Sequence, residues 1–183
     1  MRVNIIGKAP GWQDAPIDGV CWGFNDHILK RPFSVMFDMH DIGNHERVVG
    51  KNGWKLGKLN RSESNAKCAE TETPIFSLGY VDGLPVIEYP LSDICKHFDT
   101  DYFSCGVAYA MAMAIYQKMT EIDIWGVFLS FGGEHAYQKP CIEYWIGRAI
   151  GLGIKVTVHG MTTLLKNSGN KLYGYNYKQV VAE

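Results

Sequence analysis

The second half of the chain alternates apolar segments of helical and of strand character, and this order limits the possible folds more than any other feature. Residues 104–119 (SCGVAYAMAMAIYQKM) place apolar side chains at helical spacing, whereas residues 122–129 (IDIWGVFL) form a continuous apolar run typical of a buried parallel strand. A second helix is expected to begin at Pro140 and to end at the glycines 151 and 153, before a strand at residues 154–158. With a strand at residues 85–89, this order predicts an α/β domain with a mostly parallel sheet flanked by helices.

The first half of the chain contributes short apolar segments that predict further strands. These segments are residues 3–6, 20–24 and 33–37, and a short helix is expected at residues 91–97. Residues 50–74 are polar and rich in Gly, Asn, Ser and Lys, so we expect a surface excursion of the single domain at this place.

Composition excludes several classes of protein. The chain has 183 residues, of which 46% are hydrophobic and 20% charged, and its formal net charge is -1. These values fit one globular domain and argue against a nucleic-acid partner. No apolar run approaches the length of a membrane span, and five cysteines without CxxC spacing do not suggest a disulfide framework or a zinc site. We therefore expect a cytoplasmic protein that does not bind membranes; a homo-oligomer is compatible with the sequence.

Polar residues follow each predicted strand or open each predicted helix, at the edge of the sheet where α/β proteins bind their ligands. Because ligands lie beyond the carboxyl ends of parallel strands, the sequence predicts that five segments meet there. These segments are residues 7–11, 25–27, 38–41, 103–106 and 132–138.

Two of these segments have the character of anion-binding turns. GKAPG at residues 7–11 is neither a dinucleotide fingerprint nor a P-loop, so a phosphate-binding turn with Gly7, Lys8 and Pro10 and a plain strand-to-loop turn both stay open. Ser104 is expected to cap the long helix, and the free N–H groups at this helix end, near Cys105 and Gly106, could in addition hold an anion.

Residues 38–41 contain side chains of the metal-ligand type. On a strand, however, Asp38 and His40 share a face while Asp41 points to the other, so contact of Asp38 and His40 with a substrate is favoured over a metal site. Cys105 at a helix start could have a lowered pKa, but no histidine partner follows it in sequence, so a thiol nucleophile is disfavoured.

The densest cluster of chemically competent side chains is GGEHAYQ, residues 132–138. His135 could act as a general base, Tyr137 could donate to a leaving phosphate, and Glu134 could orient the histidine or hold a hydroxyl group. The alternative is a solvated loop in which Gln138 or Lys139 caps the following helix. Four such residues at the edge of a sheet favour a functional site.

The motifs together resemble those of a known family. In chain order they are GxxP, WGxN, FDxH, YFSxxxAYAxAxAIY, EIxIWGV, ExAYQxPxxEYWIGxAxGLGIKV, LLK and LYGY. This pattern resembles phage and prophage proteins related to the motility accessory factor and 6-hydroxymethylpterin pyrophosphokinase-like family, and more distantly the Rossmann-like sialyltransferases of the Campylobacter type. It covers nearly the whole chain except residues 50–74. The resemblance implies a Rossmann-like domain and, for a phage-encoded protein, the host cytoplasm.

The resemblance also implies roles for individual residues. In the sialyltransferases, a Gly-Pro loop, an Asn after the second strand and a Ser-Gly helix start hold a cytidine nucleotide, which corresponds here to Gly7 with Pro10, Asn25, and Ser104 with Gly106. A later histidine acts as base and tyrosine hydroxyl groups assist the departing phosphate. Here these would be His135 and Tyr137.

Two hypotheses on function follow from these residues and from the resemblance. The first is a transferase with a nucleotide-activated donor, for glycosyl transfer or for diphosphoryl transfer; the latter would need magnesium, held by Asp38, Asp41 or Glu134 between phosphates. The second is a phage accessory protein that binds a nucleotide without chemistry. The sequence does not identify the nucleotide or the acceptor.

Overall fold

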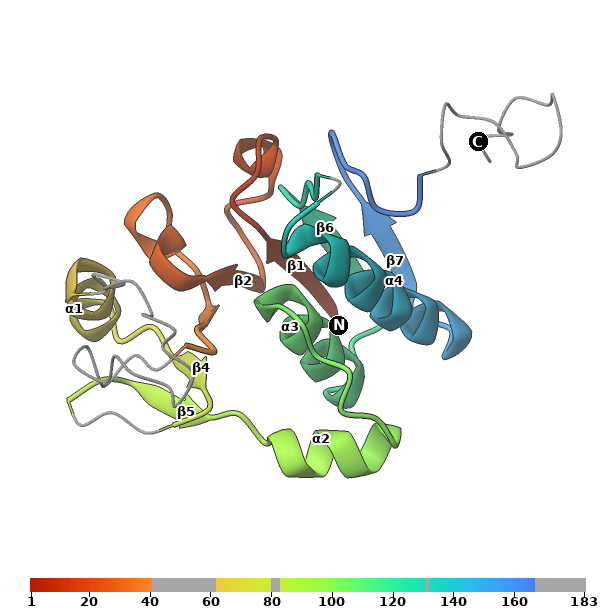
Figure 1. Ribbon diagram of the computed structural model, residues 1–183. Helices are drawn as coiled ribbons and strands as arrows, with labels where there is room; N and C mark the ends of the chain where they lie inside the picture. The colour runs from red at the N-terminus through yellow and green to blue at the C-terminus, as the bar shows by residue number, and fades with distance from the viewer. Residues whose placement is uncertain (41–61, 80–82, 131, 167–183) are drawn as a thin grey trace, which may run out of the picture.

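A computed structural model describes residues 1–40, 62–79, 83–130 and 132–166 of the chain. Within these ranges, seven strands form one sheet in the order β5-β4-β3-β2-β1-β6-β7, and every pair of neighbours is parallel (Figure 1). The strands are β1 (Arg2–Ile6), β2 (Cys21–Phe24), β3 (Val35–Phe37), β4 (Ile75–Ser77), β5 (Val86–Glu88), β6 (Glu121–Trp125) and β7 (Lys155–Val158). The predicted α/β class with a parallel sheet of Rossmann-like type is confirmed.

Two helices cover one face of this sheet. They are α3 (Gly106–Tyr116) and α4 (His135–Gly151), with α2 (Leu91–Phe98) packed beside α3 (Figure 1). The alanines at 108, 110, 112 and 114 of α3 are completely buried, so the helix lies close to the strands. Trp145 of α4 is also completely buried, and its Nε1–H donates a hydrogen bond of 3.0 Å to the Tyr102 carbonyl oxygen. This face therefore carries the larger hydrophobic core.

The opposite face is less uniformly covered. Over β2 to β4 lie the short 3₁₀ helix η2 (Asn25–Leu29) and α1 (Ser62–Glu70), which enclose a smaller apolar cluster that includes Ile6, Met36 and Cys68. Over β1 and β6 the same face also carries polar residues, because strand side chains alternate between the faces and place Asn4 and Asp123 there. Both side chains are nevertheless buried.

Two elements were not expected from the sequence. Helix α1 lies within the predicted polar excursion at residues 50–74, whose first part is outside the described residues; Cys68 of α1 is only 2% exposed and anchors this helix on the sheet. Strand β4 has only three residues, too few for a visible alternation pattern. It nevertheless connects β3 to β5 in the sheet.

The predicted start of the second long helix at Pro140 is wrong, because α4 begins at His135. Gly132 and Gly133 have positive φ values of 124° and 56°, and the first turn closes by hydrogen bonds from the amides of residues 136–138 to Gly133 and Glu134. A proline is favoured at a helix start but is also tolerated soon after it, so its position did not define the first residue. His135 to Gln138 are consequently helical, not part of a loop.

The boundaries of other elements also differ from the prediction, most of all those of α3 and β6. Helix α3 starts at Gly106 with Cys105 as its N-cap residue, so the predicted cap at Ser104 is wrong. Strand β6 ends at Trp125, four residues before the predicted end, because Gly126 turns the chain with a φ of 58°. Among the described helices, none is both long and apolar enough to cross a membrane.

Candidate functional site

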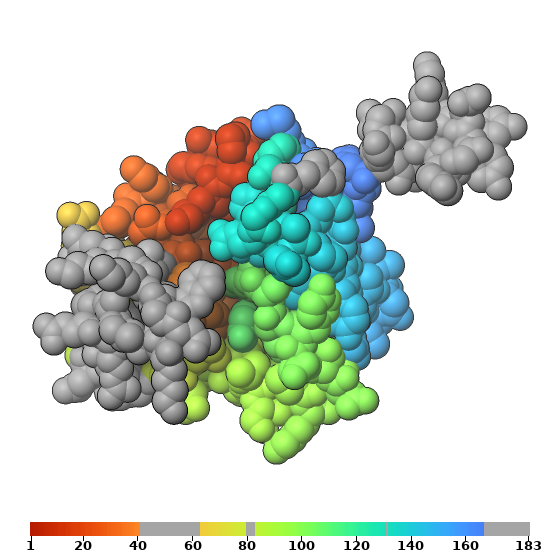
Figure 2. Space-filling model, viewed as in Figure 1, coloured from red at the N-terminus to blue at the C-terminus, as the bar shows by residue number. Residues whose placement is uncertain are grey.

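A cavity of about 450 Å³ lies where the strand order reverses, at the carboxyl ends of β1 and β6. In chain order β1 is followed by β2 on one side, and the chain later returns to place β6 on the other. On one face of the molecule, the segments within the first 40 residues, red to orange in Figure 2, meet the starts of α3 and α4. Each of the five predicted segments contributes to the cavity lining, which includes Gly7, Lys8, Asn25, His40, Ser104, Cys105, Gly106, Glu134, His135 and Gln138.

A close contact between two glycines forms the floor of the site. The amide of Gly7 donates to the Trp125 carbonyl oxygen at 2.8 Å, and the amide of Ala9 donates to the Gly126 carbonyl oxygen at 2.8 Å. A Cβ atom on Gly7 would clash with the Gly126 carbonyl oxygen, and one on Gly126 would lie 2.8 Å from the Ala9 carbonyl oxygen. Gly7 is therefore required for the contact between the two loops, which accounts for it without any ligand.

Two helix N-termini open on the cavity. Residues 104–107 line it at the start of α3, while Glu134, His135 and Gln138 line it at the start of α4. Neither N-cap residue, Cys105 or Glu134, caps its helix with a side-chain hydrogen bond within the described part of the chain. The first amide groups of a helix carry partial positive charge and attract anions. Together with Lys8, whose Nζ lies 2.7 Å from Asp26 Oδ1, they favour a negatively charged ligand.

Ser104 connects the two helix starts. Its hydroxyl group donates a hydrogen bond of 3.0 Å to the Tyr137 carbonyl oxygen. The Tyr137 side chain itself is 74% exposed and does not line the cavity, and neither does Pro10. The structure thus does not bring the Tyr137 hydroxyl group to the place where a departing phosphate would lie.

The Cys105 thiol lines the cavity but is not activated. Burial raises its pKa to about 11, and nearby amide groups of Ala108 and Val107 offset this only in part. The thiol is therefore protonated at neutral pH, in keeping with the sequence argument against a nucleophilic cysteine.

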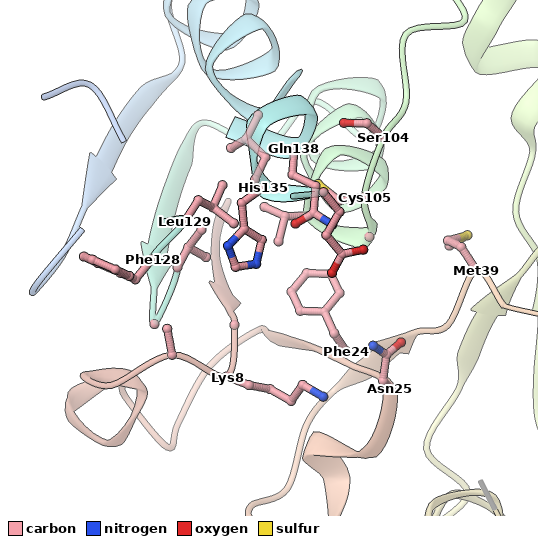
Figure 3. A pocket seen from close by; sticks show the side chains of 18 of the residues that line it. Lys8, Phe24, Asn25, Met39, Ser104, Cys105, Phe128, Leu129, His135 and Gln138 are labelled. Atoms are coloured by element: carbon pink, nitrogen blue, oxygen red, sulfur yellow. The ribbon is translucent and has the colours of Figure 1, made fainter. Parts of the chain in front are cut away.

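Two of the described histidines line the cavity, and each binds a different kind of partner through Nδ1. His40 Nδ1 lies 2.7 Å from Oδ1 of Asp38, a buried carboxylate behind the cavity wall that also accepts the His40 amide at 3.2 Å. His135 Nδ1 lies 2.9 Å from the Ser130 hydroxyl oxygen. Figure 3 shows the His135 ring projecting from α4 into the cavity, beside Leu129 and above Lys8. Asp41 lies outside the described residues.

Asn25 occupies an unusual backbone conformation at the cavity edge. Its φ is 56°, in the left-handed region that asparagine tolerates better than most residues. It is the first residue after β2, where this turn directs its side chain towards the cavity from the side opposite His135 (Figure 3). Strained residues of this kind concentrate at ligand-binding sites.

The sequence prediction missed residues 126–129, because it assigned them to a strand. They form the cavity wall after β6, and threonines from the segment that follows β7 support this wall. The Thr162 hydroxyl group donates to the Val127 carbonyl oxygen at 2.9 Å, and Thr163 donates to the Leu129 carbonyl oxygen at 2.8 Å. Such pairing between distant segments leaves no local sequence signal.

The described carboxylates do not form a magnesium site. Magnesium prefers carboxylates combined with phosphate oxygens, yet the described residues contain no group of three or more His, Cys, Asp and Glu side chains placed to hold a metal. Among the described residues, Glu134 is the one carboxylate that lines the cavity, since Asp38 lies behind His40. This donor set does not fit metal-bridged diphosphoryl transfer.

No protein-family model matches the sequence, and searches of curated proteins and of solved structures find no match. The resemblance to the motility accessory factor and sialyltransferase families therefore stays a prediction.

Proposed function

We propose that the protein is a transferase that binds a nucleotide-activated donor, of the glycosyltransferase type, in the cavity at the carboxyl ends of β1 and β6. The observation that carries this proposal is the convergence of Lys8 and two helix N-termini, neither capped by a described side chain, on a cavity of about 450 Å³. Such a volume lies within the range of small-molecule sites. The helix ends suit phosphate groups, and the polar side chain of Asn25 at the end of β2 suits a nucleoside.

The chemistry of glycosyl transfer needs a base for the acceptor hydroxyl group and stabilisation of the leaving phosphate. The cavity lining offers histidine as base and helix amides with Lys8 as anion-stabilising groups. Metal-bridged diphosphoryl transfer is less well supported, because Glu134 is the one carboxylate that lines the cavity among the described residues, which do not include Asp41.

The first experiment measures binding. Nucleoside mono- and diphosphates and nucleotide sugars are titrated into the full chain by calorimetry, and their effect on the melting temperature is recorded. Asn25→Ala and Lys8→Ala should weaken binding by about threefold to tenfold each, as expected for the loss of one hydrogen bond or one exposed charge. The matched controls, Tyr137→Phe and Lys30→Ala, change exposed side chains outside the cavity and should bind like the parent protein.

The second experiment measures turnover with the nucleotide sugars that bind, in the presence of a panel of hydroxyl acceptors. Transfer or slow hydrolysis of the donor supports the transferase. Binding without any turnover would instead support the non-catalytic nucleotide-binding protein, an alternative favoured by the exposure of Tyr137. If no nucleotide binds, both functions are refuted.

A further inference from the structure

The two histidines of the cavity differ in the chemical nature of their Nδ1 partners, and this difference determines what each ring presents to a ligand. A carboxylate is only an acceptor, whereas a hydroxyl group can both accept and donate. The proton position on an imidazole follows from such partners, because the ring nitrogen that binds an acceptor must carry the hydrogen.

For His40 the partner fixes the proton on Nδ1. Asp38 is 4% exposed and accepts both the His40 ring at 2.7 Å and the His40 amide at 3.2 Å. With the hydrogen on Nδ1, the basic lone pair of the neutral ring is on Nε2. A buried carboxylate that orients a histidine in this way also stabilises the imidazolium ion, as in the Asp-His pairs of hydrolases. His40 has the environment of a general base.

For His135 the surroundings favour the opposite arrangement. Ser130 is exposed and its hydroxyl hydrogen can turn towards Nδ1, 2.9 Å away, which leaves the hydrogen of the neutral ring on Nε2. His135 is the first residue of α4. Lys8, the start of α3 and the exposed residue Glu134 line the same cavity as His135.

A neutral histidine at a helix N-terminus is a hydrogen-bond donor to a developing negative charge rather than a base. We infer that His135, positioned by Ser130, donates its Nε2–H to an oxygen of the leaving phosphate, and that His40, positioned by Asp38, is the base. This inference rests on the proposed function and assigns the roles within it. It replaces the sequence-based prediction of His135 as base.

The step is balanced without a further reactant. The acceptor hydroxyl group gives its proton to His40 Nε2 as its oxygen forms a bond to the anomeric carbon of the donor sugar. The bond between this carbon and the phosphate oxygen breaks, and the electron pair stays on the phosphate. The phosphate oxygen then accepts the hydrogen bond from His135 and from the helix amides.

The test determines directly which ring nitrogen of each histidine carries the hydrogen, and it needs no measurement of enzymatic activity. Proton–nitrogen correlation NMR of the full chain with labelled histidines, above the pKa range of imidazole, distinguishes the two neutral forms of each ring. His40→Gln and His135→Gln assign the two signals among the six histidines. We expect the hydrogen on Nδ1 of His40 and on Nε2 of His135. A hydrogen on Nδ1 of His135 would overturn the inference.

Substitutions at Ser130 test its positioning role. Ser130→Thr keeps the hydroxyl group and should behave like the parent protein, and Ser130→Ala should weaken pyrophosphate binding by about threefold to tenfold. Ser130→Asp offers His135 the same kind of partner as His40 has, so the hydrogen should move to Nδ1. Retention of the parent NMR pattern in Ser130→Asp would contradict the role of this residue.

Titration with inorganic pyrophosphate separates this inference from the proposed function. A shift of the His135 Nε2–H signal, lost in Ser130→Ala and restored in Ser130→Thr, supports the inference. If pyrophosphate and nucleotides shift the Asn25 and Lys8 signals but not those of His135, the inference is wrong while the proposed function stands. If none of these signals shifts, the proposed function fails together with the inference.

Discussion

The two faces of the sheet are built from different kinds of interaction. The face under α3 and α4 is a continuous apolar core, to which both the strands and the helices contribute fully buried side chains. The opposite face buries polar groups: His27 beside β2, and Asp123 of β6 between Arg2 and His159. The difference teaches that the sheet is stabilised by apolar packing on one face, whereas its other face also accommodates buried polar groups.

The two polar sites on the second face also differ from each other. Asp123 is hydrogen-bonded to Arg2 at 2.6 Å and to His159, which stacks on Trp125 at a centroid distance of 3.7 Å. His27 is 2% exposed, and neither of its ring nitrogens reaches hydrogen-bonding geometry with a described residue. One site is therefore satisfied by partners, whereas the other is held by packing against Trp12 and Phe33.

The largest effect is expected on the apolar face. Trp145→Ala removes a completely buried ring that stacks on Phe103 and donates to the Tyr102 carbonyl oxygen. It should lower the free energy of unfolding by about 3–5 kcal/mol, as is usual for large aromatic side chains in cores. Urea denaturation measures this loss, with exposed Ile150→Ala on the same helix as control. A loss as small as that of the control would contradict the assignment of the core.

A smaller loss is expected for Asp123→Ala on the polar face. This change removes the shared partner of Arg2 and His159, but both of these side chains keep access to water. We expect a decrease of about 1–3 kcal/mol in the free energy of unfolding at neutral pH. The same denaturation assay compares it with Trp145→Ala, and an equal or larger loss would show that polar contacts dominate the stability.

His27 should make stability depend on pH. Burial lowers its pKa below the ordinary value, an effect that the nearby Ile6 carbonyl only partly offsets. The unfolded chain then binds a proton more readily than the folded protein, so stability falls as the pH drops through about 6.5 towards the folded pKa. His27→Leu should remove this dependence between mildly acidic and neutral pH. If the free energy of unfolding of this variant depended on pH as it does in the parent protein, the lowering of the His27 pKa by burial would be refuted.

The smallest effect concerns acid stability at Asp123. Burial tends to raise the pKa of this carboxyl group, but hydrogen bonds from Arg2 and His159 outweigh it and lower the pKa overall. Its contribution to stability is thus present above the unfolded pKa and is lost as the pH falls through the folded one. Arg2→Gln should raise the pKa of Asp123 and move the acid-denaturation midpoint to higher pH. An unchanged midpoint would mean that His159 alone holds the carboxylate.

Much of the fold could be predicted because burial leaves a local pattern in the sequence. The apolar runs around Ile124 in β6 and Val156 in β7, and the helical spacing in α3, are such patterns. Strand β4 and helix α1 escaped prediction, since one is too short and the other too polar to show a period.

For the site, the sequence predicted which segments meet but not how their side chains are oriented. The meeting of five segments follows from the rule that ligands lie at the carboxyl ends of parallel strands. The direction of Tyr137 depends on the extra helical turn before Pro140, and the Ser130–His135 contact depends on side-chain geometry. Neither has a sequence signal, so both features became visible only in three dimensions.

The hydrogen bond from Ser104 to the Tyr137 carbonyl oxygen has a consequence for protein engineering. It joins the beginnings of α3 and α4 through a main-chain atom, as the Gly7 and Gly126 contacts join the loops after β1 and β6. The width of the opening therefore depends on the main chain and on the Ser104 hydroxyl group, while its chemical character is carried by side chains such as Asn25 and Gln138. A library that randomises these side chains would vary ligand preference on a constant frame.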